Sequence, residues 1–466
     1  MTSGKLQIGW ARGDITPLRK TLLMGQFHAR LSTGVLSPLT ATALALEVRG
    51  ADGAVEQAVL LSCDLVCDKF KPDLLRELAG RCPGLDLNKI TVNTTHTHAA
   101  PTMTRGIYDE PANDPEFLGP DEYRLWLAVR LAETVAEAWN GRKPGSVARG
   151  FGYAVVGRCR RAVYADGKAA MYGDTNQPDF IGFESCDDHA INLLFTRDAA
   201  GALTGVVVNV ACPSQCDEQV YVVSSDFWHN VRQEIAARHG AAVHVLPQCA
   251  PAGDMSPHLL TDKQAETGLR SRLGLDAKGI IARRILAAVD EGLASASPFR
   301  DTVSFAHSVK TLRLPRLMVS AAEYELEKRI PSMSEAERAR QPYAFQRLWP
   351  FGGACDLVTR YEQQKEHPVH EVEAHVIRLD DVALATNAFE LFVDYGTQIR
   401  CRSRAAQTFL VQLADGSGDG GYLPTQRALN GGHYSALIKS NWVGPAGGRV
   451  LVDETVRTID ALFARA

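Results

Sequence analysis

The stretch from Lys89 to Pro101 constrains the fold more than any other part of the chain. Residues 89–93 are short and rich in β-branched side chains, which is typical of a buried strand. Pro101 then prevents a regular element from continuing. His96 and His98 therefore follow the carboxyl end of a strand, where ligand sites of α/β sheets gather. Because side chains alternate along an extended backbone, we expect both imidazoles to face one side, either sharing a metal ion or hydrogen-bonded in a polar loop.

The same stretch completes a strand–helix–strand unit. An apolar run over residues 58–65 predicts a buried strand, and residues 72–81 carry leucines at helical spacing. Further strands are predicted over residues 42–48, 189–196, 203–210, 242–246, 302–314, 369–379, 382–387 and 408–413, and helices over residues 121–139, 227–239, 278–294, 320–340, 388–400 and 453–464. Two of the strand pairs have hairpin spacing. With no internal repeat and no linker, residues 1–466 are expected to form one large α/β domain, a mixed sheet with flanking helices.

The charge balance excludes some classes of partner. The 466 residues carry 50 basic and 54 acidic side chains, so neither nucleic acid nor an anionic membrane is an expected partner. The N-terminus lacks a long apolar segment, and no run approaches the roughly 18 apolar residues of a membrane span. The ten cysteines are scattered, so we expect reduced thiols in a cytoplasmic protein that acts on a small molecule. The oligomeric state stays open.

The motif from Gly253 to Pro257 is a second candidate for chemistry. Gly, Asp, Ser and Pro all favour turns, and a tight turn is one interpretation. In the functional interpretation, Ser256 is a nucleophile and Asp254 orients a neighbouring group. A serine nucleophile needs a base. The sequence leaves open whether His98 activates Ser256 or whether a metal-bound hydroxide attacks in its place.

Several short motifs follow one another in a characteristic order. They are Gly13–Pro17, Asn93–Pro101, Arg160–Arg161, Gly253–Pro257, Glu390 after Asn-Ala-Phe, Gly421–Thr425 and Tyr434. Over nearly the whole chain, this order resembles the catalytic domain of the neutral/alkaline, non-lysosomal ceramidase family. Members of that family hydrolyse the amide of N-acyl sphingosine with one zinc ion, which is held by two histidines, a glutamate and a tyrosine. The resemblance therefore implies a zinc-dependent hydrolase on the same fold.

The resemblance also implies a set of zinc ligands. His96 matches the first zinc histidine, Glu390, expected at the start of a helix, matches the glutamate, and Tyr422 matches the tyrosine. The second histidine is absent, and Cys212 falls on its position. A cysteine thiolate is an acceptable zinc ligand. The alternative replacement is His229, which is expected in the first turn of a helix near the site.

Further residues are implied around the reaction centre. Ser256 matches the proposed catalytic serine, and Arg160 and Tyr434 match residues that contact the substrate amide or the intermediate. His98 would lie beside the reacting atoms. Arg160 and Tyr434 each have a structural alternative, since a basic cluster commonly forms ion pairs and a tyrosine commonly packs in a core.

These observations predict a zinc-dependent hydrolase that cleaves an amide, or secondarily an ester, in a small polar N-acyl compound. The small substrate is expected because the chain carries neither an export signal nor the C-terminal β-rich domain that accompanies lipid hydrolysis in the family. Two alternatives are a true ceramidase and a non-catalytic ligand-binding protein that kept the fold after Cys212 replaced a ligand.

Overall fold

A computed structural model describes residues 1–466 except 113, 335, 338–339, 341–355, 417–419 and 465–466. Its centre is a 12-stranded mixed sheet. The first strand, β1 (Thr2–Asp14), is the branch point of this sheet. It pairs with β2 (Thr40–Gly50) from Gly4 to its end, with β14 (Thr302–Pro315) at its first residues and with β5 (Lys143–Tyr153) through two residues in its middle.

Three arms of the sheet leave this branch point. Their further strands are β3 (Val55–Cys63) and β4 (Ile90–Thr94) beyond β2, then β10 (Ala190–Asp198), β11 (Leu203–Val210) and β12 (His244–Cys249) beyond β5, and β15 (Val369–Leu379), β16 (Val382–Thr386) and β18 (Gln407–Val411) beyond β14. Apolar side chains from all three arms meet in one core, among them Leu60, Leu194 and Leu384. The arms therefore curl towards one another and bury their inner faces together.

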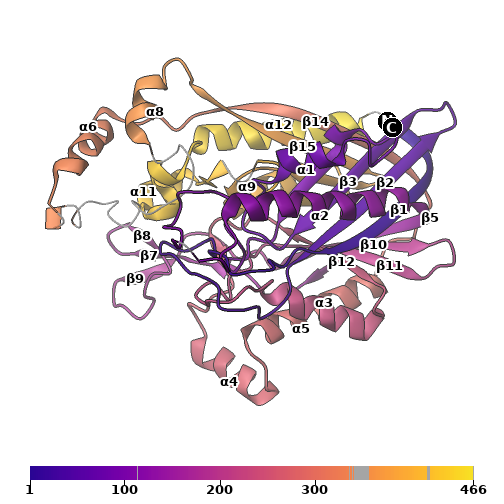
Figure 1. Ribbon diagram of the computed structural model, residues 1–466, viewed down its shortest axis with the longest axis horizontal. Helices are drawn as coiled ribbons and strands as arrows, with labels where there is room; N and C mark the ends of the chain where they lie inside the picture. Colours follow the sequence, from indigo (N-terminus) through magenta and orange to yellow (C-terminus); the bar gives the residue numbers. More distant parts are fainter. Residues whose placement is uncertain (113, 335, 338–339, 341–355, 417–419, 465–466) are drawn as a thin grey trace.

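Helices cover the outer faces of the sheet (Figure 1). They are α1 (Lys71–Leu78) and α2 (Pro120–Asn140) over β1 and β2, α3 (Phe227–His239) and α5 (Ala277–Ala294) over the arm that contains β10, and α9 (Val393–Arg402) and α12 (Pro445–Phe463) over β14 and β15. Each pair contributes an apolar face to a separate core cluster. The result is a layered α/β arrangement, as expected when a helix can bury only one stripe of its surface.

The remaining elements are mostly short. They are β6 (Arg158–Cys159), β7 (Arg161–Tyr164), β8 (Ala169–Met171), β9 (Phe180–Phe183), β13 (Met255–Ser256), β17 (Glu390–Leu391), β19 (Tyr422–Leu423), α4 (Lys263–Leu273), α6 (Ala321–Arg329), α8 (Leu357–Gln363), α11 (Gln426–Gly431) and the 3₁₀ turns Leu87–Lys89, Ile330–Ser332, Tyr434–Ala436 and Ile438–Ser440. None of the helices among the described residues has the length and apolar composition that a membrane span needs.

The predicted α/β class is confirmed, and so are both predicted hairpins and the helix over residues 227–239. The predicted helix start at Glu390 is wrong, because Glu390 lies in β17 and α9 begins only at Val393. The predicted helix over residues 320–340 is shorter, since α6 ends at Arg329 and a 3₁₀ turn follows. The rest of that predicted range includes positions outside the described residues.

Candidate active site

His96 and His98 lie in the turn after β4, as predicted, but they do not come together in the predicted way. The backbone at His96 has a φ of 63°, which is left-handed, so alternation along an extended chain does not apply. The two rings still meet edge to face, with centroids 4.9 Å apart. Gly25 allows this approach, because a Cβ atom there would lie 2.3 Å from Cγ of His98.

Glu390 faces His96 from the short strand β17. In the parallel pairing of β17 with β19, Glu390 stands opposite Tyr422. The Nδ1 atom of His96 donates to the carbonyl oxygen of Val66 at 3.0 Å, since a carbonyl can only accept. In the neutral ring, Nε2 of His96 then carries a lone pair, and this atom lies 3.5 Å from Oε2 of Glu390.

The spacing between these two atoms fits a shared metal ion. A lone pair and a carboxylate oxygen repel each other unless a proton or a cation lies between them, and 3.5 Å is too long for a good hydrogen bond. Two ligands at zinc–nitrogen and zinc–oxygen bond lengths in a tetrahedral site are about 3.4 Å apart. The carbonyl that fixes His96 is also the kind of partner that orients metal-binding histidines.

Arg160 is fully buried beside Glu390. Its terminal nitrogens donate to the hydroxyl of Tyr172 at 2.7 Å, to Oε1 of Gln215 at 3.2 Å and to the carbonyl oxygen of Gly253 at 2.9 Å. A longer ion pair of 3.6 Å joins it to Glu390. Burial alone would lower the pKa of Arg160, but the surrounding tyrosines and Glu390 raise it. Its Nε–H is buried and has no hydrogen-bond partner among the described residues.

Gln215 connects Arg160 to His98. Because its Oε1 accepts from the guanidinium, its amide nitrogen faces Nε2 of His98, 2.9 Å away. An amide nitrogen donates, so Nε2 of His98 accepts and the ring proton is on Nδ1. That Nδ1 lies 3.6 Å from Oε2 of Glu218 and is otherwise unpartnered within the described part of the chain. Burial, followed by the nearby His96, holds the pKa of His98 well below its ordinary value, so this ring stays neutral.

Ser256 lies in β13 and has a histidine partner that the sequence analysis missed. Its Oγ lies 2.9 Å from Nδ1 of His258, and Nε2 of His258 lies 3.2 Å from Oε1 of Glu218. Only two positions separate Ser256 from His258, so the sequence held a signal for this pair. Glu218 comes from a distant segment and carried no such signal.

The remaining residues predicted for the reaction centre are buried near Arg160. Tyr422 and Tyr434 have ring centroids 6.1 Å apart, and burial raises the pKa of each phenol. Asp254 accepts from the backbone N–H of Val393 at 2.9 Å and from the hydroxyl of Ser185 at 2.6 Å. Asp254 therefore anchors the start of α9 and holds it against the Ser256 motif.

Cys212 and His229 do not join His96 and Glu390. Across the described residues, one group of three His, Cys, Asp or Glu side chains converges closely enough to hold an ion, and it contains none of these four. Burial, with Cys249 nearby, raises the pKa of the Cys212 thiol well above its ordinary value. His229 lies in the first turn of α3, where burial and Arg232 lower its pKa.

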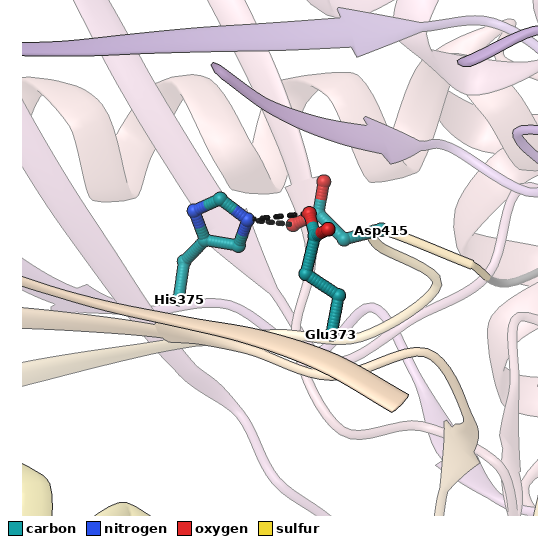
Figure 2. A group of neighbouring side chains, drawn as sticks. All are labelled: Glu373, His375 and Asp415. Atoms are coloured by element: carbon teal, nitrogen blue, oxygen red, sulfur yellow. Dashed lines mark hydrogen bonds and ion pairs between the residues drawn. The ribbon is translucent and has the colours of Figure 1, made fainter. Parts of the chain in front are cut away.

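The converging group is Glu373, His375 and Asp415, which the sequence analysis did not predict (Figure 2). Nε2 of His375 lies 2.8 Å from Oε1 of Glu373 and 3.7 Å from Oδ2 of Asp415. The chain supplies its own cation here, because Nζ of Lys71 lies 2.6 Å from Glu373 and 2.5 Å from Asp415. An ammonium already holds the position that a metal ion would need.

A chain of hydrogen bonds also sets the protons of this group. Nδ1 of His307 donates to the carbonyl of Gln57 at 3.0 Å, so its Nε2 accepts from Nδ1 of His375 at 2.9 Å. The second nitrogen of His375 is at hydrogen-bond distance from Glu373 and therefore donates its proton to that carboxylate. Lys71 and His375 thus supply a cation and a proton to this cluster, while Oδ2 of Asp415 has no hydrogen-bond partner among the described residues.

No protein-family model matches the chain, and no curated protein matches it in sequence. Its fold matches solved structures. One is a ceramidase complexed with C2, with a TM-score of 0.65 and 17% identity over 99% of this chain and 76% of that one. Another is the neutral ceramidase from Pseudomonas aeruginosa, with a TM-score of 0.65 and 16% identity over 99% of this chain and 75% of that one. The chain therefore has the fold of neutral ceramidases, which confirms the resemblance at the level of architecture.

Proposed function

We propose that this protein is a zinc-dependent hydrolase of amide bonds in small polar N-acyl compounds. The observation that carries the proposal is the 3.5 Å gap between Nε2 of His96 and Oε2 of Glu390, beside the buried Arg160. The fold that the chain shares with two ceramidase structures adds support, because those proteins are named for the cleavage of an amide.

One zinc ion would be held by His96, Glu390 and Tyr422, and it would supply a Lewis acid that polarises the scissile carbonyl. An imidazole, a carboxylate and a phenol are suitable donors, and three protein ligands are typical of a catalytic zinc site. Cys212 and His229 are left out of this set, because neither converges with His96 and Glu390.

The chain's own residues would bind and orient the acyl group. The Nε–H of Arg160 and the Nδ1–H of His98 are buried donors without a close partner among the described residues. Such donors cost free energy when they stay unsatisfied, so a substrate with matching acceptors is favoured over an apolar one. An oxygen that becomes negative during amide cleavage is a suitable acceptor for Arg160.

This donor set supports a small polar substrate over a long-chain lipid. A true ceramidase is the alternative that the fold suggests, and an ester is the alternative bond. A non-catalytic binding protein is a further candidate, because Cys212 stands where the family resemblance places a second zinc histidine. We also infer a cytoplasmic location, which is consistent with free thiols at all nine cysteines of the described part of the chain.

The test measures zinc content and hydrolysis on the same purified protein. The panel consists of N-acetyl amino acids, their methyl esters and long-chain ceramide in detergent micelles. We expect one zinc per chain and turnover of the N-acetyl compounds. Efficient turnover of ceramide would mean that the protein is a true ceramidase and not a hydrolase of small polar compounds. A zinc-free protein that binds these compounds without cleaving them would be the non-catalytic binding protein.

A further inference from the structure

Ser256, His258 and Glu218 form a path of polar contacts, with a hydrogen-bond contact of 2.9 Å between Ser256 and His258 and an approach of 3.2 Å between His258 and Glu218. The hydroxyl oxygen of Ser256 accepts from the backbone N–H of His258 at 2.9 Å, so its proton is available to donate to the lone pair of Nδ1 on the same residue. The other ring nitrogen then carries the proton, and it faces Oε1 of Glu218 at 3.2 Å. The path therefore runs in one direction, from hydroxyl to imidazole to carboxylate.

Glu218 lies between two histidines. Its Oε1 faces His258, and its Oε2 lies 3.6 Å from Nδ1 of His98. His98 is fixed by Gln215, as described above, and presents a neutral N–H to this carboxylate. Arg30, a buried guanidinium, interacts electrostatically with Glu218 as well. The carboxylate thus lies among nitrogen groups from three distant segments.

We infer that His258 and Glu218 activate Ser256 as the nucleophile of the proposed amide hydrolysis, so the inference rests on that function. The roles follow the logic of a serine–histidine–carboxylate triad, although here the serine faces Nδ1 and the carboxylate faces Nε2. His258 is the general base and later the general acid. Glu218 is a positioning residue that orients the imidazole and stabilises its positive charge.

The reaction proceeds in two balanced halves. First, the Ser256 oxygen bonds to the acyl carbon while its proton moves to Nδ1 of His258, which then protonates the leaving nitrogen as the C–N bond breaks. This half releases the amine and leaves an acyl ester on Ser256. Second, water gives a proton to His258 and attacks the ester carbon, and the Ser256 oxygen recovers the proton as the carboxylic acid leaves.

The Ser256 hydroxyl belongs to the same polar network as Arg160, the guanidinium that would donate to a negatively charged oxygen of the substrate. The ring of Tyr172 meets that of His258 edge to face, with centroids 5.2 Å apart, and its hydroxyl accepts from Arg160 at 2.7 Å. The free Nε–H of Arg160 belongs to the same guanidinium. A nucleophile, its base and a donor for an oxyanion therefore belong to one connected polar network.

A purely local role makes a different prediction. Serine hydroxyls commonly accept from the backbone two residues later in turns, and the Ser256–His258 contact would then be a turn contact without reactivity. The reactivity of the Ser256 hydroxyl separates the two readings, because a turn serine does not react with a sulfonyl fluoride.

The experiment treats the full-length protein with methanesulfonyl fluoride, a small reagent suited to the buried Ser256, with and without EDTA. Intact mass and peptide mapping should find one sulfonyl group on Ser256 in both conditions. His258→Gln keeps the backbone N–H and should slow labelling by about 10²-fold or more, and Glu218→Gln should slow it at least about tenfold. His239→Gln is the matched control, since Nε2 of His239 lies 2.7 Å from Oδ1 of Asp290 where α3 meets α5, and this variant should label normally.

The labelling rate of the wild type should rise with pH as an imidazole loses its proton, and His258→Gln should lose this limb. Absence of label in the folded wild type, or equal labelling in His258→Gln, overturns the inference. Labelling that depends on His258, without hydrolysis of any amide, leaves the activation of Ser256 by His258 and Glu218 standing and removes the proposed function. Amide hydrolysis at an unchanged rate in Ser256→Ala overturns the inference and leaves the proposed function standing.

Discussion

Two regions of the molecule bring a histidine and a glutamate together with different spacings. In the candidate active site, the facing nitrogen and oxygen of His96 and Glu390 are 3.5 Å apart. In the second cluster, the corresponding atoms of His375 and Glu373 are 2.8 Å apart. The shorter distance suits a shared proton and the longer one a shared ion. Residue types alone therefore do not identify a metal site; the distance and the local cations do.

The source of positive charge also differs. Lys71 contacts both carboxylates of the second cluster at hydrogen-bond distance, so that cluster needs no external cation. Arg160 stays 3.6 Å from Glu390 and gives its hydrogen bonds to other oxygens. In the second cluster, Lys71 provides the positive charge that the carboxylates need. In the candidate active site, a carboxylate and an imidazole face each other.

The largest effect on activity should come from replacing Glu390 by glutamine, and the same replacement at Glu373 is the matched control. Glu390→Gln is expected to lower amide turnover by about 10³-fold and zinc well below one per chain, because it removes a ligand and its charge. Glu373→Gln should leave both unchanged. Metal analysis after zinc loading and dialysis, together with initial rates, checks this; zinc loss in Glu373→Gln alone would reverse the two assignments.

Removing the lysine of the second cluster should chiefly affect stability. Lys71→Met leaves the buried Asp415 without its cation and is expected to lower the free energy of unfolding by about 3–5 kcal/mol. Lys5→Met, which breaks the exposed pair with Asp301, should cost less than about 1 kcal/mol. Urea unfolding measures both. Equal stabilities of the two variants would mean that Lys71 does not hold the cluster together.

The second cluster should accept a metal ion once its lysine is gone. A surface pocket of about 330 Å³, lined by Lys71, Glu373 and Asp415, gives access to it. In a His96→Ala background, Lys71→Ala is expected to restore binding of Co²⁺ or Zn²⁺ and to gain about 2–3 kcal/mol of stability at a hundredfold excess over Kd. Visible absorption of Co²⁺ reports the binding. If the double variant binds no more Co²⁺ than His96→Ala, the ammonium is not what excludes a metal ion.

The smallest effect concerns pH. Hydrogen bonding from His375 and the charge of Lys71 outweigh burial and lower the pKa of Glu373 from 4.5 to about 2. A depressed carboxyl pKa gives stability that is present above pH 4.5 and is lost as the pH falls towards 2. Glu373→Gln should therefore flatten the acid limb of stability between these values. Thermal unfolding at a series of pH values measures this dependence. An equally steep loss of stability with falling pH in Glu373→Gln would contradict the lowered pKa of Glu373.

Much of the architecture could be predicted from the sequence, and the exceptions have physical causes. Helix 227–239 carries its own cap in Asp226, and the hairpins carry their own turn residues, so local chemistry sets their bounds. Glu390 was placed in a helix because its neighbours are compatible with one. Its pairing with Tyr422 across β17 and β19 depends on a segment from elsewhere in the chain.

The candidate site shows the same division. His96, Glu390 and Arg160 were predicted from the family resemblance, and Glu390 lies near both of the others. Cys212 and His229 do not converge with His96 and Glu390. The role of each predicted residue remains a prediction. The Ser-x-His spacing of Ser256 and His258 was visible in the sequence, but nothing in a single sequence indicates that Glu218 completes the path.

Local sequence is enough to specify the periodic elements, the order of motifs and the contact between Ser256 and His258, which are two residues apart. Only the tertiary structure decided which charges meet, as with Lys71 and Asp415, 344 residues apart. Periodicity and turn chemistry act over a few residues and can be read along the chain. Whether a histidine and a carboxylate stop at 2.8 or 3.5 Å depends on how the arms of the sheet and their covering helices pack, because packing fixes backbone positions that no local pattern encodes.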